Sequence, residues 1–254
     1  MVTDRELALM NAIAQTLPSI INLLCTWHIE KDVLAKTKKH FTTKEEFDLF
    51  FVQWQRVMWA PTEDVFEQER DTLHATYGES HHAVVEYLQA TWLSRKENFV
   101  LAWTKRVPHL GHVVNSRTEG KHSIMKGWIN VSTGDLKDVY DKISLAIDHQ
   151  EHCIRQQIAY DKSTVLLSHT HSIWSEVNRE ISHFALRKTL EQFRKALHLN
   201  ANNPPCTNVL RNTMGLPCAH VLKSLLDRNE KLTRNHFHAQ WWLKRPGMRT
   251  SKSL

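Results

Sequence analysis

The sequence predicts a mainly α-helical protein that carries a small α/β part. Glycine and proline are scarce, with 7 of each in 254 residues, which disfavours the many tight turns of a β-sandwich. Apolar and aromatic residues recur at three- and four-residue steps over long stretches, as on the buried face of an amphipathic helix. Near the N-terminus a helical pattern is followed by an apolar run of strand length, and this alternation is typical of an α/β layer.

The composition excludes several classes of protein. Hydrophobic residues at 41% and charged residues at 24% are ordinary for a globular chain. No window approaches 18 uninterrupted apolar residues, so neither a membrane span nor a membrane partner is expected. The four cysteines are too few and too scattered for a disulfide framework, which predicts an intracellular, reducing compartment. The net charge of +6 permits binding to a polyanion without demonstrating it.

The N-terminal segment, residues 1–29, is expected to hold one helix and one strand. Thr3 and Glu6 have the spacing of a capping box, so Thr3 is the expected N-cap of a helix over residues 7–17. Residues 19–24 form the apolar run of strand length. Because a lone strand cannot make a sheet, its partners must lie elsewhere in this chain, where no good candidate stands out, or upstream of Met1.

Residues 30–112 are expected to form a helical region rich in aromatic side chains. Aromatic residues interleaved with Lys and Arg can act as base-stacking platforms for single-stranded nucleic acid, but the helical spacing favours a packed core instead. The residues that carry this spacing are Phe47, Phe50, Phe51, Trp54, Val57, Met58, Tyr87, Leu88, Trp92, Phe99 and Trp103.

The second half of the chain reads as three parts. Residues 113–199 contain a helix that Ser116 or Thr118 can cap and two long amphipathic helices, over about 136–160 and about 181–197. The first of these places Cys153 on an apolar face, where we expect it in the core. A polar stretch then marks a boundary, after which residues 200–243 form a small module and residues 244–254 a basic tail, which is either a solvated end or a nucleic-acid contact.

A cysteine and histidine pattern is the most specific chemical signal. Eleven residues separate Cys206 from Cys218, and His220 follows Cys218 after one residue. Thiolate and imidazole suit zinc, and small zinc modules are built from close ligand pairs beside a turn. Gly215-Leu-Pro supplies such a turn, and a helix is expected over 219–227. The alternative interpretation is a buried cysteine pair beside an incidental histidine.

These residues resemble the SWIM-type zinc finger, whose pattern is Cys-x-Cys … Cys-x-His. The resemblance implies Zn²⁺ held by Cys206, Cys218 and His220. Pro204 stands where the first cysteine of the pattern belongs, so one of four ligands is absent. Another group would then complete the site, or zinc would bind weakly. The candidates for the fourth ligand are His198, His236, His238 and water.

Two carboxylates, Asp4 and Glu119, allow two interpretations. By themselves they read as an acid near the start of a helix and a surface carboxylate. They could also share a divalent metal, because two-metal phosphoryl transfer uses oxygen ligands of this kind.

Three further segments resemble Mutator-like element (MULE) transposases. Val2–Ile13 is similar to the motif of their second catalytic aspartate, and Cys25–Ile29 looks like their Cys-x-x-His segment. Asn115–Lys126 resembles the helix that carries their catalytic glutamate. Together with the SWIM-type pattern, four motifs occur in the family's order from residue 2 to residue 220.

The resemblance implies a DDE-type recombinase with an RNase H-like core and a helical insertion, in which three carboxylates hold two Mg²⁺ or Mn²⁺ ions. Asp4 matches the second aspartate and Glu119 the glutamate. The first aspartate belongs well upstream of Asp4, so the chain is expected to be a C-terminal fragment with an incomplete catalytic site. The implied partner is DNA at transposon ends in the nucleus. Transposases often act as multimers, so a homo-oligomer is a further expectation.

Other candidate residues follow from the same resemblance or from charge. Cys25 and His28 supply half a zinc shell and are interpreted as structural or DNA-proximal. Basic residues outside the apolar stripes are candidates for phosphate contacts. These are Lys36, Lys38, Lys39, His40, Lys105 and Arg106.

Two alternatives to a transposase fragment remain. Plant far-red-response regulators resemble the same framework with a SWIM finger, so the chain could be a non-enzymatic regulator that binds nucleic acid or protein. A plain helical scaffold without metal is the third interpretation.

Overall fold

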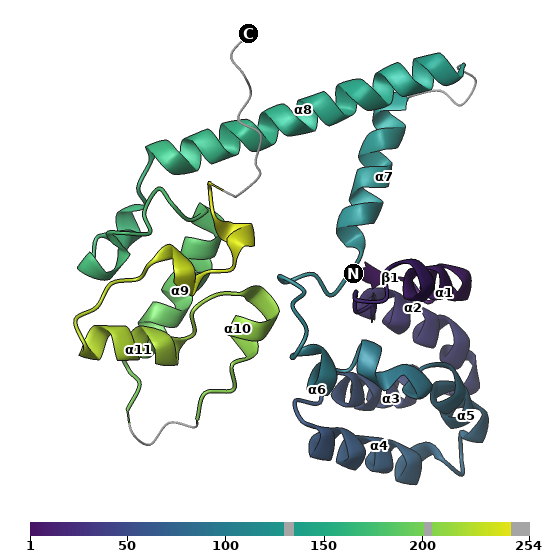
Figure 1. Cartoon of the computed structure of the whole chain (residues 1–254). Coiled ribbons are helices and arrows are strands. Elements are labelled where there is room, and N and C mark those ends of the chain that lie inside the picture. Colours follow the sequence, from purple (N-terminus) through teal and green to yellow (C-terminus); the bar gives the residue numbers. More distant parts are fainter. Residues whose placement is uncertain (130–134, 201–204, 245–254) are drawn as a thin grey trace. The chain divides into compact units, whose positions relative to one another are not determined.

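The computed structural model describes residues 1–129, 135–200 and 205–244 and is mainly helical (Figure 1). The strands within these ranges are β1 (Val2–Thr3) and β2 (Leu23–Leu24). The expected mainly α chain with a small α/β part is therefore confirmed at this level. Within the described residues, no helix combines the length and apolar character needed to cross a membrane.

The chain divides into two compact units. Met1–Glu119 form the first and Gly120–Leu254 the second. The division falls within α7 (Ser116–Ile129), so this helix begins in one unit and ends in the other.

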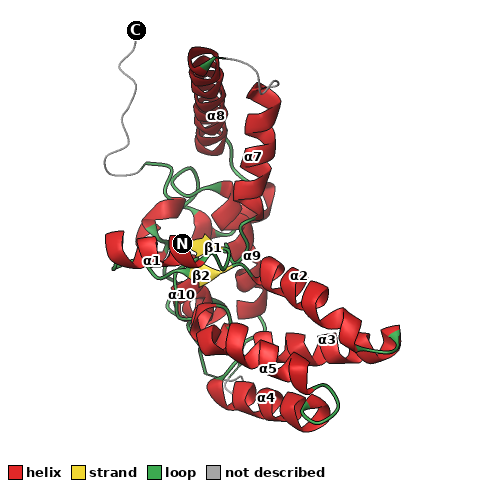
Figure 2. Ribbon diagram, turned by 90° about the vertical axis from the view of Figure 1, so that its right-hand side faces the viewer, coloured by secondary structure: helices red, strands yellow, loops and turns green. Residues whose placement is uncertain are grey.

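The sheet of the first unit is a parallel pair (Figure 2). Val2 pairs with Leu23 and Thr3 with Leu24, and α1 (Leu7–Thr16) connects the two strands. The partner of the second strand is thus Val2–Thr3, a segment that the sequence analysis placed in a motif and beside a helix but did not offer as the partner strand. Of the expected strand over residues 19–24, only Leu23 and Leu24 form β2, and each is 2% exposed, whereas Ile20 and Ile21 are 40% and 52% exposed.

The first helix is capped by a different residue from the one expected. Thr3 lies in β1, so the predicted capping box is wrong. Instead the Glu6 carboxylate accepts hydrogen bonds from the backbone N–H groups of Ala8, at 3.1 Å, and Leu9, at 2.6 Å. A carboxylate at this position satisfies backbone donors of the first turn and interacts favourably with the helix dipole.

The rest of the first unit is a set of packed helices. Their apolar faces form one core, so the aromatic residues at helical spacing are core residues, as predicted: Phe50 and Trp54 are each 0% exposed. Phe51, Tyr87 and Trp103 are partly buried and pack against this core. The helices are α2 (Thr26–Thr37), η1 (Lys38–His40), α3 (Lys44–Met58), α4 (Glu63–Tyr77), α5 (His82–Thr91), η2 (Leu93–Asn98) and α6 (Leu101–Thr104).

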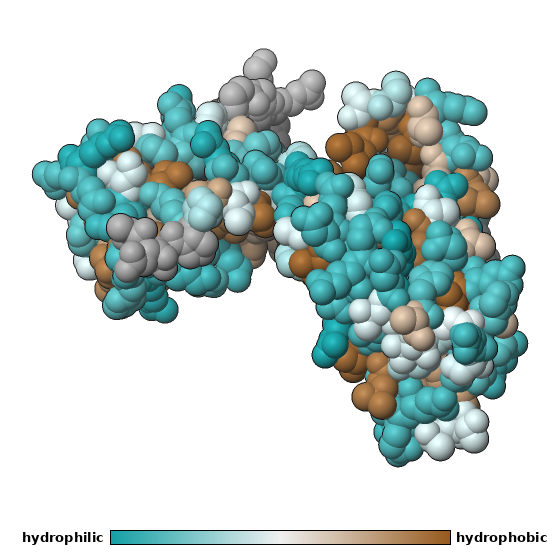
Figure 3. Space-filling model, turned by 90° about the horizontal axis from the view of Figure 1, so that it is seen from below, coloured by the Kyte–Doolittle hydropathy of each residue, from teal (hydrophilic) through white to brown (hydrophobic). Residues whose placement is uncertain are grey.

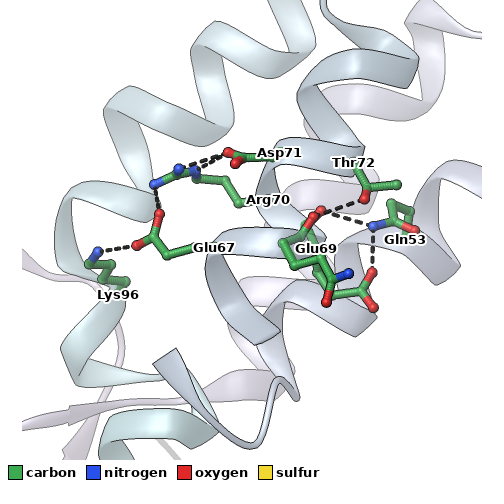
Figure 4. Close-up of polar contacts among 8 residues, drawn as sticks. Gln53, Glu67, Glu69, Arg70, Asp71, Thr72 and Lys96 are labelled. Atoms are coloured by element: carbon green, nitrogen blue, oxygen red, sulfur yellow. Dashed lines mark hydrogen bonds and ion pairs between the residues drawn. The ribbon is translucent and has the colours of Figure 1, made fainter. Parts of the chain in front are cut away.

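Polar contacts hold α4 against its neighbours (Figure 4). Gln53 on α3 donates from Nε2 to both the backbone oxygen and the carboxylate of Glu69, each at 2.9 Å. Lys96 on η2 pairs with Glu67 at 3.2 Å, and its ammonium lies 4.9 Å from the centre of the Phe66 ring. These contacts fix the register of α4 above the apolar core.

The second unit is also helical. Its helices are α8 (Leu136–Ser163), η3 (Leu167–His169), η4 (Ser172–Trp174), α9 (His183–Ala196), α10 (Val209–Met214), α11 (Ala219–Asp227), η5 (Arg234–His236) and η6 (Ala239–Trp241). The three helices predicted over 136–160, 181–197 and 219–227 are confirmed as α8, α9 and α11. The apolar faces of α9 and α11 pack on each other and, together with Trp174, form the core.

The expectation for Cys153 is wrong. It lies on α8 but is exposed, with its Sγ 3.7 Å from Nε2 of His149. Several other apolar side chains of α8 are exposed too, because the part of the second unit that the structure describes covers only some faces of this long helix. Figure 3 shows hydrophobic residues as separate groups on a mainly hydrophilic face of the molecule.

A buried histidine lies in the core of the second unit. His169 is 1% exposed, contacts the Trp174 ring at 4.4 Å between centroids, and lies with Nε2 3.1 Å from the Leu186 carbonyl oxygen. Burial lowers the pKa of His169 below its ordinary value of 6.5, and the hydrogen bond to Leu186 opposes this shift only in part.

We expect the second unit to lose stability as the pH falls below about 6.5, because His169 then takes up a proton in the unfolded chain before it does so in the folded one. The loss continues as the pH falls through the lowered folded-state pKa. His169→Gln keeps an N–H donor but does not titrate, so its melting temperature should depend less steeply on pH between neutral and mildly acidic buffers. Equal slopes for the two proteins, measured by circular dichroism, would contradict this account.

Candidate functional site

The cysteine and histidine motif near the C-terminus forms a compact donor cluster in the second unit. One ligand atom each of Cys206, Cys218 and His220 lies within 4.8 Å of the other two. The two sulfur atoms are 3.4 Å apart. Cys218 is buried and the other two residues are half-buried, so the cluster lies at the edge of the core.

A glycine turn positions this cluster. Gly215 ends α10 in the left-handed conformation, with φ +62°, and turns the chain toward α11. Its carbonyl oxygen accepts a hydrogen bond from the His238 backbone N–H at 2.8 Å. Leu216 is then buried in the core, and Cys218 becomes the N-cap of α11, with His220 in the first turn.

The chemistry of the donors fits a thiophilic ion. Burial, and the neighbouring Cys218 sulfur, raise the pKa of the Cys206 thiol above its ordinary value. A cation between the two sulfurs would reverse this effect, because it stabilises both thiolates. Two sulfurs and one imidazole are three of the four ligands of a tetrahedral zinc site.

One of the expected candidates for the fourth ligand lies beside the cluster. A cavity of about 670 Å³ is lined by Cys206, Cys218 and His220 and also by His198. The other two histidines form local caps: Nδ1 of His236 accepts from the Thr233 backbone N–H at 3.0 Å, and Nδ1 of His238 accepts from the Gln240 N–H at 3.1 Å. Pro204 lies outside the described residues. Among the expected histidines, the cavity therefore favours His198.

A second cluster lies in the first unit, at the carboxyl ends of the two strands. Asp4 follows β1 and Cys25 follows β2, and parallel pairing brings both to one edge of the sheet. Ligand atoms of Asp4, Cys25 and His28 all lie within 4.8 Å of one another. His28 Nδ1 is 2.7 Å from Oδ1 of Asp4. Cys25 is 1% exposed, whereas the Asp4 side chain is 49% exposed.

Asn115 completes this second cluster. Its side-chain Nδ2 donates to Oδ1 of Asp4, across 111 residues of sequence. Its Oδ1 accepts from the Cys25 thiol at 3.2 Å, and its backbone N–H donates to the Cys25 sulfur at 3.4 Å. Sequence reasoning placed Asn115 inside a motif without giving it a role. The available signal was its position directly before the N-terminus of a predicted helix.

The second predicted carboxylate belongs to the helix that follows Asn115. Glu119 is in α7, but its side chain lies outside the described part of the structure. Of the two predicted catalytic carboxylates, the structure therefore describes the surroundings of Asp4 but not those of Glu119.

The predicted basic residues fall into two groups. Lys36, Lys38 and Lys39 are exposed at the end of α2 and in η1. Lys105 instead donates to the Pro61 carbonyl oxygen, and Arg106 pairs with Glu63 at 2.6 Å. His40, another expected phosphate contact, is exposed beside the lysines. In the basic tail, residues 245–254 lie outside the described residues.

Comparisons with known proteins give one distant similarity. No protein-family model matches the chain, and no solved structure matches it. The chain is similar to the PKS-NRPS hybrid synthetase cheA of Chaetomium globosum, with 20% identity over 281 aligned residues that cover 95% of this chain and 6% of that protein. The chain thus spans a small part of the length of the relative it matches. This similarity carries no functional assignment for the chain.

The Gly215 turn gives a direct test of how the C-terminal cluster is positioned. A Cβ at this glycine would lie 2.3 Å from Cβ of His238, and the left-handed backbone disfavours any other residue. We expect Gly215→Ala to lower the free energy of unfolding by more than the about 1–2 kcal/mol of backbone strain alone. Urea unfolding of the purified chain measures this.

Gly127→Ala is the matched control. Nothing lies within 4 Å of a Cβ at Gly127, in α7. Because alanine favours a helix over glycine, this change should leave stability equal or raise it by about 0.5–1 kcal/mol. If the two variants were equally stable, the turn at Gly215 would not be what positions the cluster.

Proposed function

We propose that the chain is the C-terminal part of a MULE-type DDE transposase that carries a SWIM-type zinc finger and acts on DNA at transposon ends in the nucleus. One observation carries the proposal. Asp4, Cys25 with His28, and Asn115 belong to three separate motifs that resemble this family, and they converge at one edge of the sheet. This convergence supports the resemblance to the family.

The catalytic part of the proposal assigns a metal role to Asp4 and Glu119. In a DDE core with an RNase H-like fold, three carboxylates hold two Mg²⁺ or Mn²⁺ ions, which activate the nucleophile and stabilise the leaving oxygen. Oδ1 of Asp4 accepts a hydrogen bond from Asn115 Nδ2 and lies 2.7 Å from His28 Nδ1, and these contacts would orient the carboxylate. These 254 residues supply two of the three carboxylates, so we expect no strand transfer from them alone.

The zinc-finger part of the proposal rests on the donor cluster in the second unit. Zn²⁺ would be held by Cys206, Cys218 and His220, with His198 or water as the fourth ligand. Bound zinc would join α11 to the segment before α10 and so stabilise a module with few helices of its own.

We expect Cys218→Ser to lower the zinc content of the purified chain by about one ion per chain and to lower the melting temperature. Cys153→Ser is the control, since its thiol is exposed and far in sequence from the cluster. Elemental analysis measures the zinc content of the two variants and of the unaltered chain. Equal zinc in the two variants would remove the zinc-finger assignment.

The DNA partner is proposed from charge and exposure. Lys36, Lys38 and Lys39 lie together in sequence and are exposed, so their ammonium groups can reach phosphates. Lys105 and Arg106 are engaged within the chain and should contribute less.

Replacing Lys36, Lys38 and Lys39 together by Ala should weaken binding to duplex DNA and reduce the slope of log affinity against log salt by up to about 3. Electrophoretic mobility shifts at several salt concentrations measure both quantities. The control replaces Lys188, Lys223 and Lys231 together by Ala. Each of these lysines contacts a carboxylate of the second unit, and they lie far in sequence from Lys36, Lys38 and Lys39. A similar loss in both triple variants would mean that net charge alone governs binding.

A non-enzymatic regulator of transcription, of the kind the far-red-response resemblance suggests, is the second candidate. The contacts of the Asp4 carboxylate with His28 Nδ1 and Asn115 Nδ2 favour it, because a carboxylate held in this way can serve structure alone. Copy number in the source genome separates the two candidates. Many copies flanked by terminal repeats indicate a transposon, whereas one unflanked copy indicates a host gene.

A further inference from the structure

We propose that Asp4, Cys25 and His28 bind a thiophilic divalent cation such as Zn²⁺, in a site separate from the Cys206 cluster. The inference uses the geometry of these side chains and does not depend on transposase activity. It gives the first unit a metal chemistry different from the Mg²⁺ chemistry that a catalytic carboxylate implies.

The backbone brings the three donors together before any ion is present. The two parallel strands end side by side, so the residues that follow them share one edge of the sheet. Cys25 is the N-cap of α2, and His28 lies in the first turn of that helix. The ligand atoms of all three residues lie within 4.8 Å of one another, which a single ion can bridge after small side-chain movements.

The Cys25 sulfur has defined neighbours on the backbone and on Asn115. The sulfur lies at the N-terminus of a 12-residue helix and accepts the Asn115 backbone N–H at 3.4 Å. The thiol proton now points to Asn115 Oδ1, at 3.2 Å. On metal binding this proton leaves to solvent, the sulfur–metal bond forms, and the backbone N–H remains as a donor to the thiolate.

Asp4 and His28 provide the other two ligands. Their Oδ1 and Nδ1 atoms are 2.7 Å apart, so one cation can reach both. The His28 ring makes an edge contact with the Trp27 ring, with centroids 4.7 Å apart, which limits its rotation. Asp4 is half exposed, which leaves the fourth position open to water.

The donor types select the ion. Sulfur and imidazole nitrogen are preferred by zinc and cobalt, whereas Mg²⁺ requires oxygen ligands in an octahedral arrangement. Of the three donors Asp4 alone offers oxygen, so these side chains by themselves favour zinc or cobalt over Mg²⁺. An ion bound here would occupy Asp4 and compete with any Mg²⁺ role of that carboxylate.

The test uses the full chain with the Cys206 cluster removed by Cys206→Ser and Cys218→Ser. The reduced, metal-free protein is titrated with Co²⁺, which reports sulfur ligation by a thiolate-to-cobalt absorption band, and then with Zn²⁺ in competition. We expect about one Co²⁺ per chain with a sulfur band, displaced by Zn²⁺ but not by excess Mg²⁺.

Variants in that background assign the ligands. Cys25→Ser should abolish the band, and Asp4→Asn and His28→Gln should each weaken Co²⁺ binding at least tenfold. Cys153→Ser should change nothing. Because Cys25 is buried, circular dichroism checks that each variant folds. If Cys25→Ser does not fold, Asp4→Asn still tests the site, because Asp4 is exposed. The proposal would be overturned if the background protein gave no sulfur band with Co²⁺. It would also be overturned if Asp4→Asn and His28→Gln bound Co²⁺ as tightly as the background protein does.

The same titration keeps this site distinct from the zinc finger. If the unaltered chain binds one ion that Cys25→Ser removes and Cys218→Ser does not, the zinc-finger assignment fails and the Asp4, Cys25 and His28 site stands. If Cys218→Ser removes the one bound ion and Cys25→Ser does not, the Asp4, Cys25 and His28 site is overturned and the zinc-finger assignment stands.

Discussion

The parallel pairing of β1 and β2 is the constraint on which the first unit depends. It consists of two residues on each strand, yet it decides where Asp4 and Cys25 lie. Because parallel strands end on the same side, residues separated by a whole helix in the sequence become neighbours. Asn115 then joins both, so the start of α7 is held next to the same sheet edge. Without this pairing, nothing in the described fold would bring Asp4 and Cys25 to one edge of a sheet.

In the second unit, the backbone conformation of a single residue has a comparable role. Gly215 adopts a backbone conformation that other residues resist, and its close approach to His238 leaves no space for a side chain. The turn brings Cys218 to the start of α11 and within 3.4 Å of the Cys206 sulfur. Both candidate metal clusters place a cysteine at the N-cap of a helix, Cys25 before α2 and Cys218 before α11.

Much of the helical architecture could be predicted because amphipathic periodicity is local information. The helix over 219–227 matches α11, and the aromatic spacing of residues 47–103 correctly identifies a core. The predicted capping role of Thr3 failed because strand pairing, a contact with residues far along the chain, outweighed the local capping pattern. Cys153 failed for the opposite reason: an apolar neighbourhood in sequence does not reveal whether another element covers that face. Asn115 could be placed in a motif, but its contacts to Asp4 and Cys25 depend on the tertiary fold. Whether Asp4 and Glu119 act together stays a prediction.

The transposase proposal is tested most directly by mapping the 5′ end of the transcript and reading the frame upstream of the Met1 codon. If the proposal is correct, the upstream frame encodes an apolar strand that ends in an aspartate, which would supply the third carboxylate beside Asp4 and Glu119. An upstream frame without such a strand and aspartate, or a transcript that encodes nothing before Met1, would contradict it.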